Sequence, residues 1–145
     1  DMKYVLNNSK AGKGAQEYLK KSFSNNQKKF GDKEKALKKE ESDLLAKKTI
    51  LSKEDYKKKT DELRKKVNSY QKERRAAIEK ITKQRAESRS ALLGKLDPIL
   101  NVYIKENNIS LIIDKKNILG GNTNLDITKV IIEKLNKELP SLSLK

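Results

Sequence analysis

The sequence of 145 residues contains no histidine, no cysteine and no tryptophan, and only two phenylalanines. Without histidine it lacks the side chain that ordinarily exchanges protons near neutral pH. Without cysteine it has no thiolate nucleophile, and with histidine also missing it has no ligand set of the kind that holds zinc. Aspartate and glutamate are plentiful, but they lie among charged helical residues, where solvated carboxylates are usual. We therefore expect no enzymatic activity, no metal and no cofactor.

Hydrophobic residues are also scarce, at 34% of the chain against 38% charged residues. No apolar run approaches the roughly 20 residues that a membrane-spanning helix needs. No secretory signal stands at the start, and because the chain begins at Asp1 we expect any leader to have been removed. Such a composition is poor material for a compact globule, yet the sequence has strong helical periodicity. An elongated fold with a small core at one end would fit both observations.

The net charge of +15 is concentrated in one part of the chain. Residues 10–95 hold 27 Lys and Arg against 13 Asp and Glu, a net charge of +14, whereas the remaining residues hold 8 against 7, a net charge of +1. A lysine-rich bias with solvated helix faces is one explanation, although a general bias would not confine the excess to one segment. The other explanation is that this segment attracts an anionic partner at long range.

Two long helices are predicted between Gln16 and about Leu93. Ser52 followed by Asp55 is typical of a helix start and divides the two. The spacing predicts an antiparallel coiled-coil hairpin over residues 15–94 with its tip near Ser52. Apolar residues recur at seven-residue intervals in both halves: Phe23, Phe30, Leu37, Leu44 and Leu51, then Tyr56, Leu63, Tyr70 and Ala77.

The seam of this hairpin is only half apolar. A regular two-stranded coiled coil has apolar residues at both core positions of the heptad. Here one of the two is polar along the whole first helix, so we expect the hairpin to flex and fray more than a well-filled coiled coil. The polar position holds Asn26 or Gln27, Lys33 or Glu34, Glu40 or Glu41, and Lys47 or Lys48.

The hairpin is predicted to meet a small body near a proline. Pro98 cannot donate to the carbonyl of Gly94, and its ring clashes with that residue. We expect a kink or break between Gly94 and Asp97, with Gly94 and Pro98 acting as the arm hinge. Residues 1–14 and 95–145 would then form the body.

The body is predicted to be of the α+β class. Ile109–Ile113 is apolar and rich in β-formers, as a strand buried on both faces would be, and Ile118–Leu119 could pair with it. Met2–Leu6 could be a strand or a turn of helix before a helix cap at Ser9, and Asp126 caps a closing amphipathic helix. One hairpin and one helix make a marginal core, so we expect the body to oligomerise. The expected core residues are Ile99, Tyr103, Leu111, Ile113, Ile118, Ile127 and Ile131.

Three stretches resemble parts of one known family. Asp1–Lys13 is similar to an opening segment in which a short strand leads into a capped Ser-x-x-Gly-Lys helix start. Leu111–Asp114 followed by Ile118–Leu119 resembles a second and third strand, and Asn124–Thr128 resembles the Asp-Ile-Thr that opens a last helix. In this order around a basic hairpin, they resemble the Skp (OmpH-like) family of periplasmic chaperones over essentially the whole chain.

The resemblance implies a jellyfish-like homotrimer, in which strands of three subunits form a shared barrel and three helical hairpins surround a cavity. It implies an ATP-independent periplasmic holdase that binds unfolded outer-membrane β-barrel proteins and prevents their aggregation. Asp1 would then mark the end of the first strand, whose earlier residues are missing from this sequence. Whether the shortened strand weakens the trimer is left open by the sequence.

Client contacts are expected on the hairpin. Apolar residues near the tip would contact exposed apolar side chains of a client, although such residues more commonly just close the tip. Basic residues along both helices would attract acidic clients. The candidate client-binding residues are Leu45, Ile50, Leu51, Tyr56, Lys28, Lys47, Lys58, Arg74 and Arg85.

Two other functions remain open at this point. A basic coiled coil could bind nucleic acid through distributed phosphate contacts, but the sequence shows no base-reading motif and no aromatic stacking platform, which argues against nucleic acid as a partner. A structural adaptor is the other alternative, with arms that bind a folded partner or an anionic lipid surface.

Overall fold

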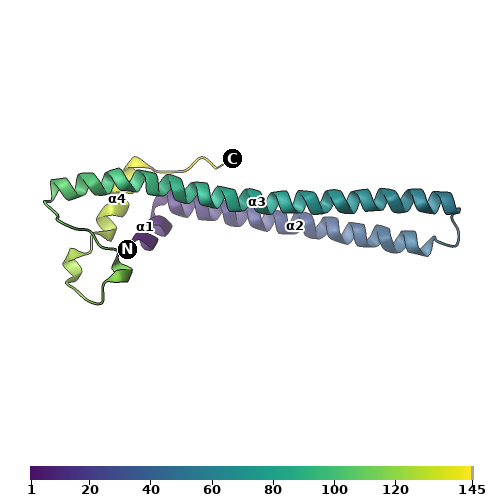
Figure 1. The fold of residues 1–145 in the computed structure, drawn as a ribbon, viewed down its shortest axis with the longest axis horizontal. Coiled ribbons are helices and arrows are strands. Elements are labelled where there is room, and N and C mark those ends of the chain that lie inside the picture. The colour runs from purple at the N-terminus through teal and green to yellow at the C-terminus, as the bar shows by residue number, and fades with distance from the viewer. Residues whose placement is uncertain (145) are drawn as a thin grey trace. The chain divides into compact units, whose positions relative to one another are not determined.

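The computed structural model describes residues 1–144, and those residues are mostly helical. The elements are α1 (Met2–Asn8), α2 (Lys10–Ala46), α3 (Lys53–Glu106), the short 3₁₀ turns η1 (Lys115–Asn117) and η2 (Thr123–Leu125), and α4 (Thr128–Glu138) (Figure 1). They fall into two compact units, a body unit of Asp1–Lys20 with Lys83–Lys145 and a hairpin unit of Lys21–Thr82. The body unit includes longer portions of α2 and α3 than the sequence predicted.

Side-chain caps begin both long helices where the sequence predicts them. The Ser9 Oγ accepts a hydrogen bond from the Gly12 backbone N–H at 3.1 Å, which satisfies a free amide in the first turn of α2. The Ser52 Oγ accepts from the Asp55 N–H at 3.1 Å and donates to the Asp55 carboxylate at 2.6 Å. This pair of bonds confirms the predicted helix start, and residues 47–51 form the turn that joins α2 to α3.

The N-terminal segment is a helix rather than the strand that the family resemblance implies. The Asp1 carboxylate accepts a hydrogen bond from the Tyr4 N–H at 2.9 Å and caps α1, which buries Val5 and Leu6. The chain then turns at Ser9, whose extended backbone ends α1, and α2 follows at once. The two helices approach so closely that a Cβ built on Gly12 would lie 1.8 Å from the Leu6 carbonyl oxygen. Only glycine fits this contact.

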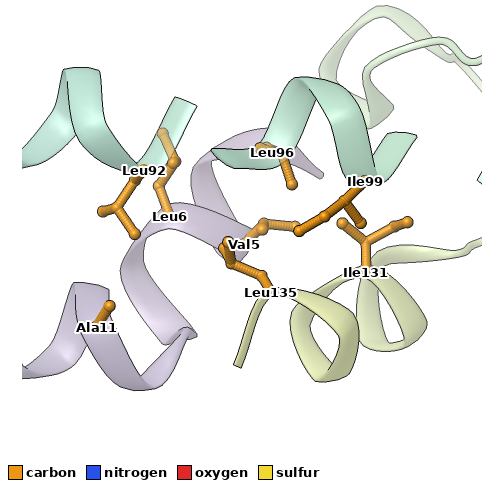
Figure 2. Packing of buried hydrophobic residues seen from close by; sticks show 8 residues of the cluster. All are labelled: Val5, Leu6, Ala11, Leu92, Leu96, Ile99, Ile131 and Leu135. Carbon is orange, nitrogen blue, oxygen red and sulfur yellow. The ribbon is translucent and has the colours of Figure 1, made fainter. Parts of the chain in front are cut away.

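The core of the body unit joins four helices. Figure 2 shows its buried apolar side chains, with Leu96 of α3 and Leu135 of α4 almost completely enclosed. Burial of this kind contributes roughly 1.5–3 kcal/mol for each large aliphatic side chain. The cluster consists of Val5, Leu6, Ala11, Leu92, Leu96, Ile99, Ile131 and Leu135.

Of the kink or break predicted between Gly94 and Asp97, the break is wrong, because α3 runs without interruption from Lys53 to Glu106 with Pro98 inside it. Proline in a helix interior costs about 3 kcal/mol. Leu92, Leu96 and Ile99 lie on both sides of the site and are buried in the core. Their burial outweighs the cost of the proline and holds the helix in one piece.

The predicted strands are also absent from the part of the chain that the structure describes. Ile109–Ile113 is largely without helix or strand, and Leu111 and Ile113 are 70% and 51% exposed rather than buried on both faces. A strand requires a partner for its backbone N–H and C=O groups. Turn η1 lies between this segment and Ile118–Leu119, as the sequence predicts for a turn, but the two segments form no strand pair in the described residues. The single chain is therefore helical rather than α+β.

Helix α4 begins beside an aspartate, as the sequence predicts, although Ile127 occupies the cap position itself. The Asp126 carboxylate accepts hydrogen bonds from the Thr128 N–H, at 3.0 Å, and from the Thr128 hydroxyl. It also accepts from the Lys115 ammonium at 2.7 Å. The bond from Lys115, followed by those from Thr128, holds the pKa of Asp126 well below its usual value. The carboxylate thus fastens η1 to the start of α4.

Candidate functional site: a groove in the hairpin unit

The seam of the hairpin unit buries few apolar side chains. Phe30 and Leu63 are its buried hydrophobic residues, while Leu37, Leu44 and Tyr70 are only half-buried. Phe23, which begins the predicted seven-residue row, is 50% exposed. The half-apolar seam that the sequence predicts therefore leaves apolar surface open to solvent.

Charged and polar side chains connect the helices where the heptad pattern lacks apolar residues. Lys33 of α2 forms an ion pair with Glu73 of α3, and Glu40 of α2 forms one with Lys66 of α3. In both pairs the residue numbers add up to 106, which fixes the antiparallel register. These ion pairs could have been found in the sequence by looking for opposite charges placed symmetrically about the hairpin tip near Ser52.

A third connection lies at the centre of the unit. The Tyr70 hydroxyl donates to the Glu34 carboxylate at 3.2 Å, and the Tyr70 ring packs edge-on against Phe30 with 6.0 Å between the ring centres. The hydrogen bond and charge of Lys38, followed by the bond from Tyr70, lower the pKa of Glu34. The hydrogen bond and charge of Lys33 likewise lower the pKa of Glu73. Both carboxylates are therefore charged and paired at neutral pH.

Next to this connection the two helices leave a groove of about 420 Å³. Phe30 and Tyr70 line it together with the half-exposed Phe23 and Ile78, which are 50% and 53% exposed. A Cβ built on Gly31 would have no neighbour within 4 Å, so the missing side chain there keeps the groove open. The lining residues are Phe23, Asn26, Gln27, Phe30, Gly31, Glu34, Tyr70, Arg74, Ile78 and Ile81.

The groove combines apolar walls with a few polar groups. The side chains of Asn26 and Gln27 make no hydrogen bond to any described residue, and Arg74 makes no ion pair with one. The charge of Arg74 acts on Glu34, whose carboxylate is already paired with Lys38 at 2.8 Å. An apolar site with a few convergent polar groups is the usual form of a binding site.

The candidate client residues from the sequence lie in several places. Of the four apolar candidates, Leu45 and Ile50 are exposed, and Leu51 and Tyr56 are half-buried, all at or beside the turn between α2 and α3. Arg74 is the candidate that lines the groove. The structure does not gather the other basic candidates into one site: Lys28, Lys47, Lys58 and Arg85 are exposed. The sequence analysis did not predict the groove itself. The available signal was Gly31 directly after Phe30, because a glycine beside a large aromatic residue leaves space on the helix surface.

The expected body-core residues also divide into two groups. Ile99 and Ile131 are buried in the core, and Tyr103 and Ile127 pack against it. Leu111, Ile113 and Ile118 are exposed in the single chain, at 70%, 51% and 46%. Gly94 is exposed and Pro98 lies inside continuous helix, so neither marks a break.

These features define a class of protein: a basic helical protein built around a long antiparallel helix pair with a sparsely filled seam. A family model described as "Outer membrane protein (OmpH-like)" matches residues 1–135. The chain therefore belongs to the OmpH-like family.

A crystal structure of a "putative outer membrane chaperone (OmpH-like)" from Caulobacter crescentus CB15 has a similar fold. The TM-score is 0.86 at 19% sequence identity, and the match covers 96% of this chain and 82% of the other. No curated protein gives a significant sequence match. Within residues 1–144, no helix has the length and apolar character needed to cross a membrane.

Proposed function

We propose that this protein is an ATP-independent holdase chaperone of the periplasm, which binds unfolded outer-membrane β-barrel proteins and prevents their aggregation. Membership in the OmpH-like family over residues 1–135 is the observation that carries the proposal. The sparsely filled seam supports it, because its exposed apolar surface could cover the apolar side chains of an unfolded client. A client covered in this way would be less prone to aggregate through pairing of its strands.

The working form in this proposal is a homotrimer assembled through the body. Leu111, Ile113 and Ile118 are exposed apolar residues in and beside a segment whose backbone forms no strand within the described chain. Copies of this segment from other subunits would supply the missing strand partners and cover the apolar side chains. The hairpins of three subunits would then enclose the client.

Charge supports capture of acidic clients. The hairpin unit holds 20 Lys and Arg against 11 Asp and Glu, a net charge of +9. Such a surface attracts acidic chains at long range, and like-charged hairpins in one trimer repel one another. Both effects weaken with salt, because the Debye length falls from about 8 Å at physiological ionic strength to about 3 Å at 1 M.

The test is an aggregation assay with the full chain. An outer-membrane β-barrel protein is diluted from urea with and without the protein, and light scattering follows aggregation at low and high salt. We expect suppression at a molar ratio of about three chains per client without ATP, with weaker suppression at high salt. Sizing chromatography with light scattering should give a threefold mass. Unchanged aggregation, or submicromolar binding to DNA at physiological salt in its place, would overturn the proposal.

A further inference from the structure

We propose that the groove of the hairpin unit binds a large apolar side chain of an extended, acidic polypeptide segment. This inference rests on the proposed function and adds a specific contact site to it. It moves the principal contact from the turn, where sequence reasoning placed it, to the centre of the helix pair. The site lies wholly within Lys21–Thr82, as its lining residues fall between Phe23 and Ile81.

The size and walls of the groove suit one large side chain and its flanking backbone. A volume of about 420 Å³ falls within the range typical of ligand sites. Phe23 and Ile78 each keep half of their surface in solvent, so an inserted apolar group would bury protein surface as well as its own. The Tyr70 ring is held in place by its contact with Phe30 and its hydrogen bond to Glu34. The ring therefore forms an aromatic wall of the groove that is already in position before a ligand binds.

The polar groups of the groove match a polypeptide backbone. Asn26 and Gln27 each carry a carbonyl acceptor and an amide donor that make no hydrogen bond to a described residue. A peptide group in an extended segment offers the complementary donor and acceptor. Side chains of this type can thus hold a main chain of any sequence, as a chaperone site requires.

The charge of the groove selects an acidic segment. Glu34 is compensated by Lys38 and Tyr70, so the charge of Arg74 is left without an ion-pair partner in the described chain. Lys29 does not line the groove, but its ammonium lies 5.5 Å from the centre of the ring of Phe30, which does. A carboxylate beside the inserted side chain would complete a charge-assisted pair with the Arg74 guanidinium.

The test uses peptides that contain a single tryptophan, because the protein has none and the fluorescence then reports the peptide alone. A twelve-residue acidic peptide with one central Trp is titrated with the full chain, beside a basic peptide with the same Trp. Gly31→Leu adds a large side chain at a lining position that has open space at its Cβ, and Ile78→Ser removes an exposed apolar wall. Gly94→Leu is the matched control, because Gly94 is also a helical glycine with open space at its Cβ.

We expect Gly31→Leu and Ile78→Ser each to weaken binding of the acidic Trp peptide about tenfold or more, whereas Gly94→Leu leaves it unchanged. Arg74→Gln should weaken the acidic peptide and spare the basic one. Helical circular dichroism establishes that each variant is folded. The groove assignment is overturned if the basic peptide binds as well as the acidic one, if the groove variants bind like the control, or if Gly31→Leu changes the oligomeric mass.

The aggregation assay separates the two proposals. If the wild type suppresses client aggregation but neither groove variant alters peptide binding, the holdase function stands and the groove assignment fails. If the wild type does not suppress aggregation, the proposed function fails, even where the groove binds a peptide.

Discussion

The close approach of α1 to α2 gives a sharp prediction about two glycines. Gly12 and Gly14 lie two residues apart in the first turns of α2, and replacing either with alanine raises helix propensity by up to about 1 kcal/mol. Their surroundings differ completely. A Cβ at Gly14 has no neighbour within 4 Å, whereas a Cβ at Gly12 lies 1.8 Å from the Leu6 carbonyl oxygen.

The structure sets the size of the effect. Ordinary van der Waals contact begins near 3.4 Å, so Gly12→Ala must push the end of α1 about 1.6 Å from α2. Leu6 and Val5 are 6% and 4% exposed, and this movement strips part of their packing. Overpacking of this kind costs about 1–3 kcal/mol. After the gain in helix propensity, we expect Gly12→Ala to lower the free energy of unfolding by up to about 2 kcal/mol and Gly14→Ala to raise it by up to about 1 kcal/mol.

Thermal unfolding followed by circular dichroism measures the difference. The propensity gain is the same for both variants, so they differ by the overpacking cost of about 1–3 kcal/mol, which for a chain of this length separates the two melting temperatures by roughly 3–10 °C. All samples must be compared at one protein concentration, since assembly shifts apparent stability. If Gly12→Ala is as stable as Gly14→Ala, the packing of α1 against α2 described here is wrong.

Three further predictions follow from local contacts. Ser52→Ala removes the cap of α3 and should lower stability by about 1 kcal/mol in urea denaturation. Asp126→Ala should lower the melting temperature at pH 7, and this effect should be lost in acid. The pKa of Asp126 is depressed in the folded chain, so its carboxylate stabilises the fold fully above the unfolded pKa of about 3.9. This stabilisation is lost as the pH falls through the lower pKa of the folded chain. Pro98→Ala should raise the melting temperature, because it restores a helical N–H and removes a ring clash worth up to about 3 kcal/mol.

Each of these has a contrary result. An unchanged Ser52→Ala would mean that the hairpin turn does not depend on its cap. A melting difference for Asp126→Ala that is the same at pH 7 and pH 2.5 would show that the carboxylate acts by shape rather than by charge. A lower melting temperature for Pro98→Ala would mean that the fixed backbone of proline, which limits the unfolded chain, outweighs its cost in the helix.

The elements that sequence reasoning located correctly are those set by local signals. Ser9 and Ser52 cap the helices that follow them, since a cap needs only residues two or three positions away. The seven-residue row of apolar residues likewise records one face of a helix. Both features depend on chemistry within a few turns of the same chain, which a single sequence contains.

The features that were missed depend on residues distant in sequence. The cost of Pro98 is visible in the sequence, but the burial of Leu96 and Ile99 that offsets it exists only after α1 and α4 pack on α3. The apolar run Ile109–Ile113 indicates a strand, but a strand forms only where a partner is present. The groove arises because Gly31 and the exposed parts of Phe23 and Ile78 meet across two helices.

The same sparse seam that exposes apolar surface in the hairpin unit also predicts how a client would act on it. With Phe30 and Leu63 as its buried hydrophobic side chains, the unit gains little stability from burial, and its exposed cross-helix ion pairs add only about 0–1 kcal/mol each. A side chain inserted beside Tyr70 would add the burial that the seam lacks. Binding and ordering of the hairpin would then be linked, because a ligand that binds only the paired helices stabilises that pairing. Under the proposed function, contacts of this sort would be weak singly and reversible, which would permit a client to be held in many conformations and released without ATP.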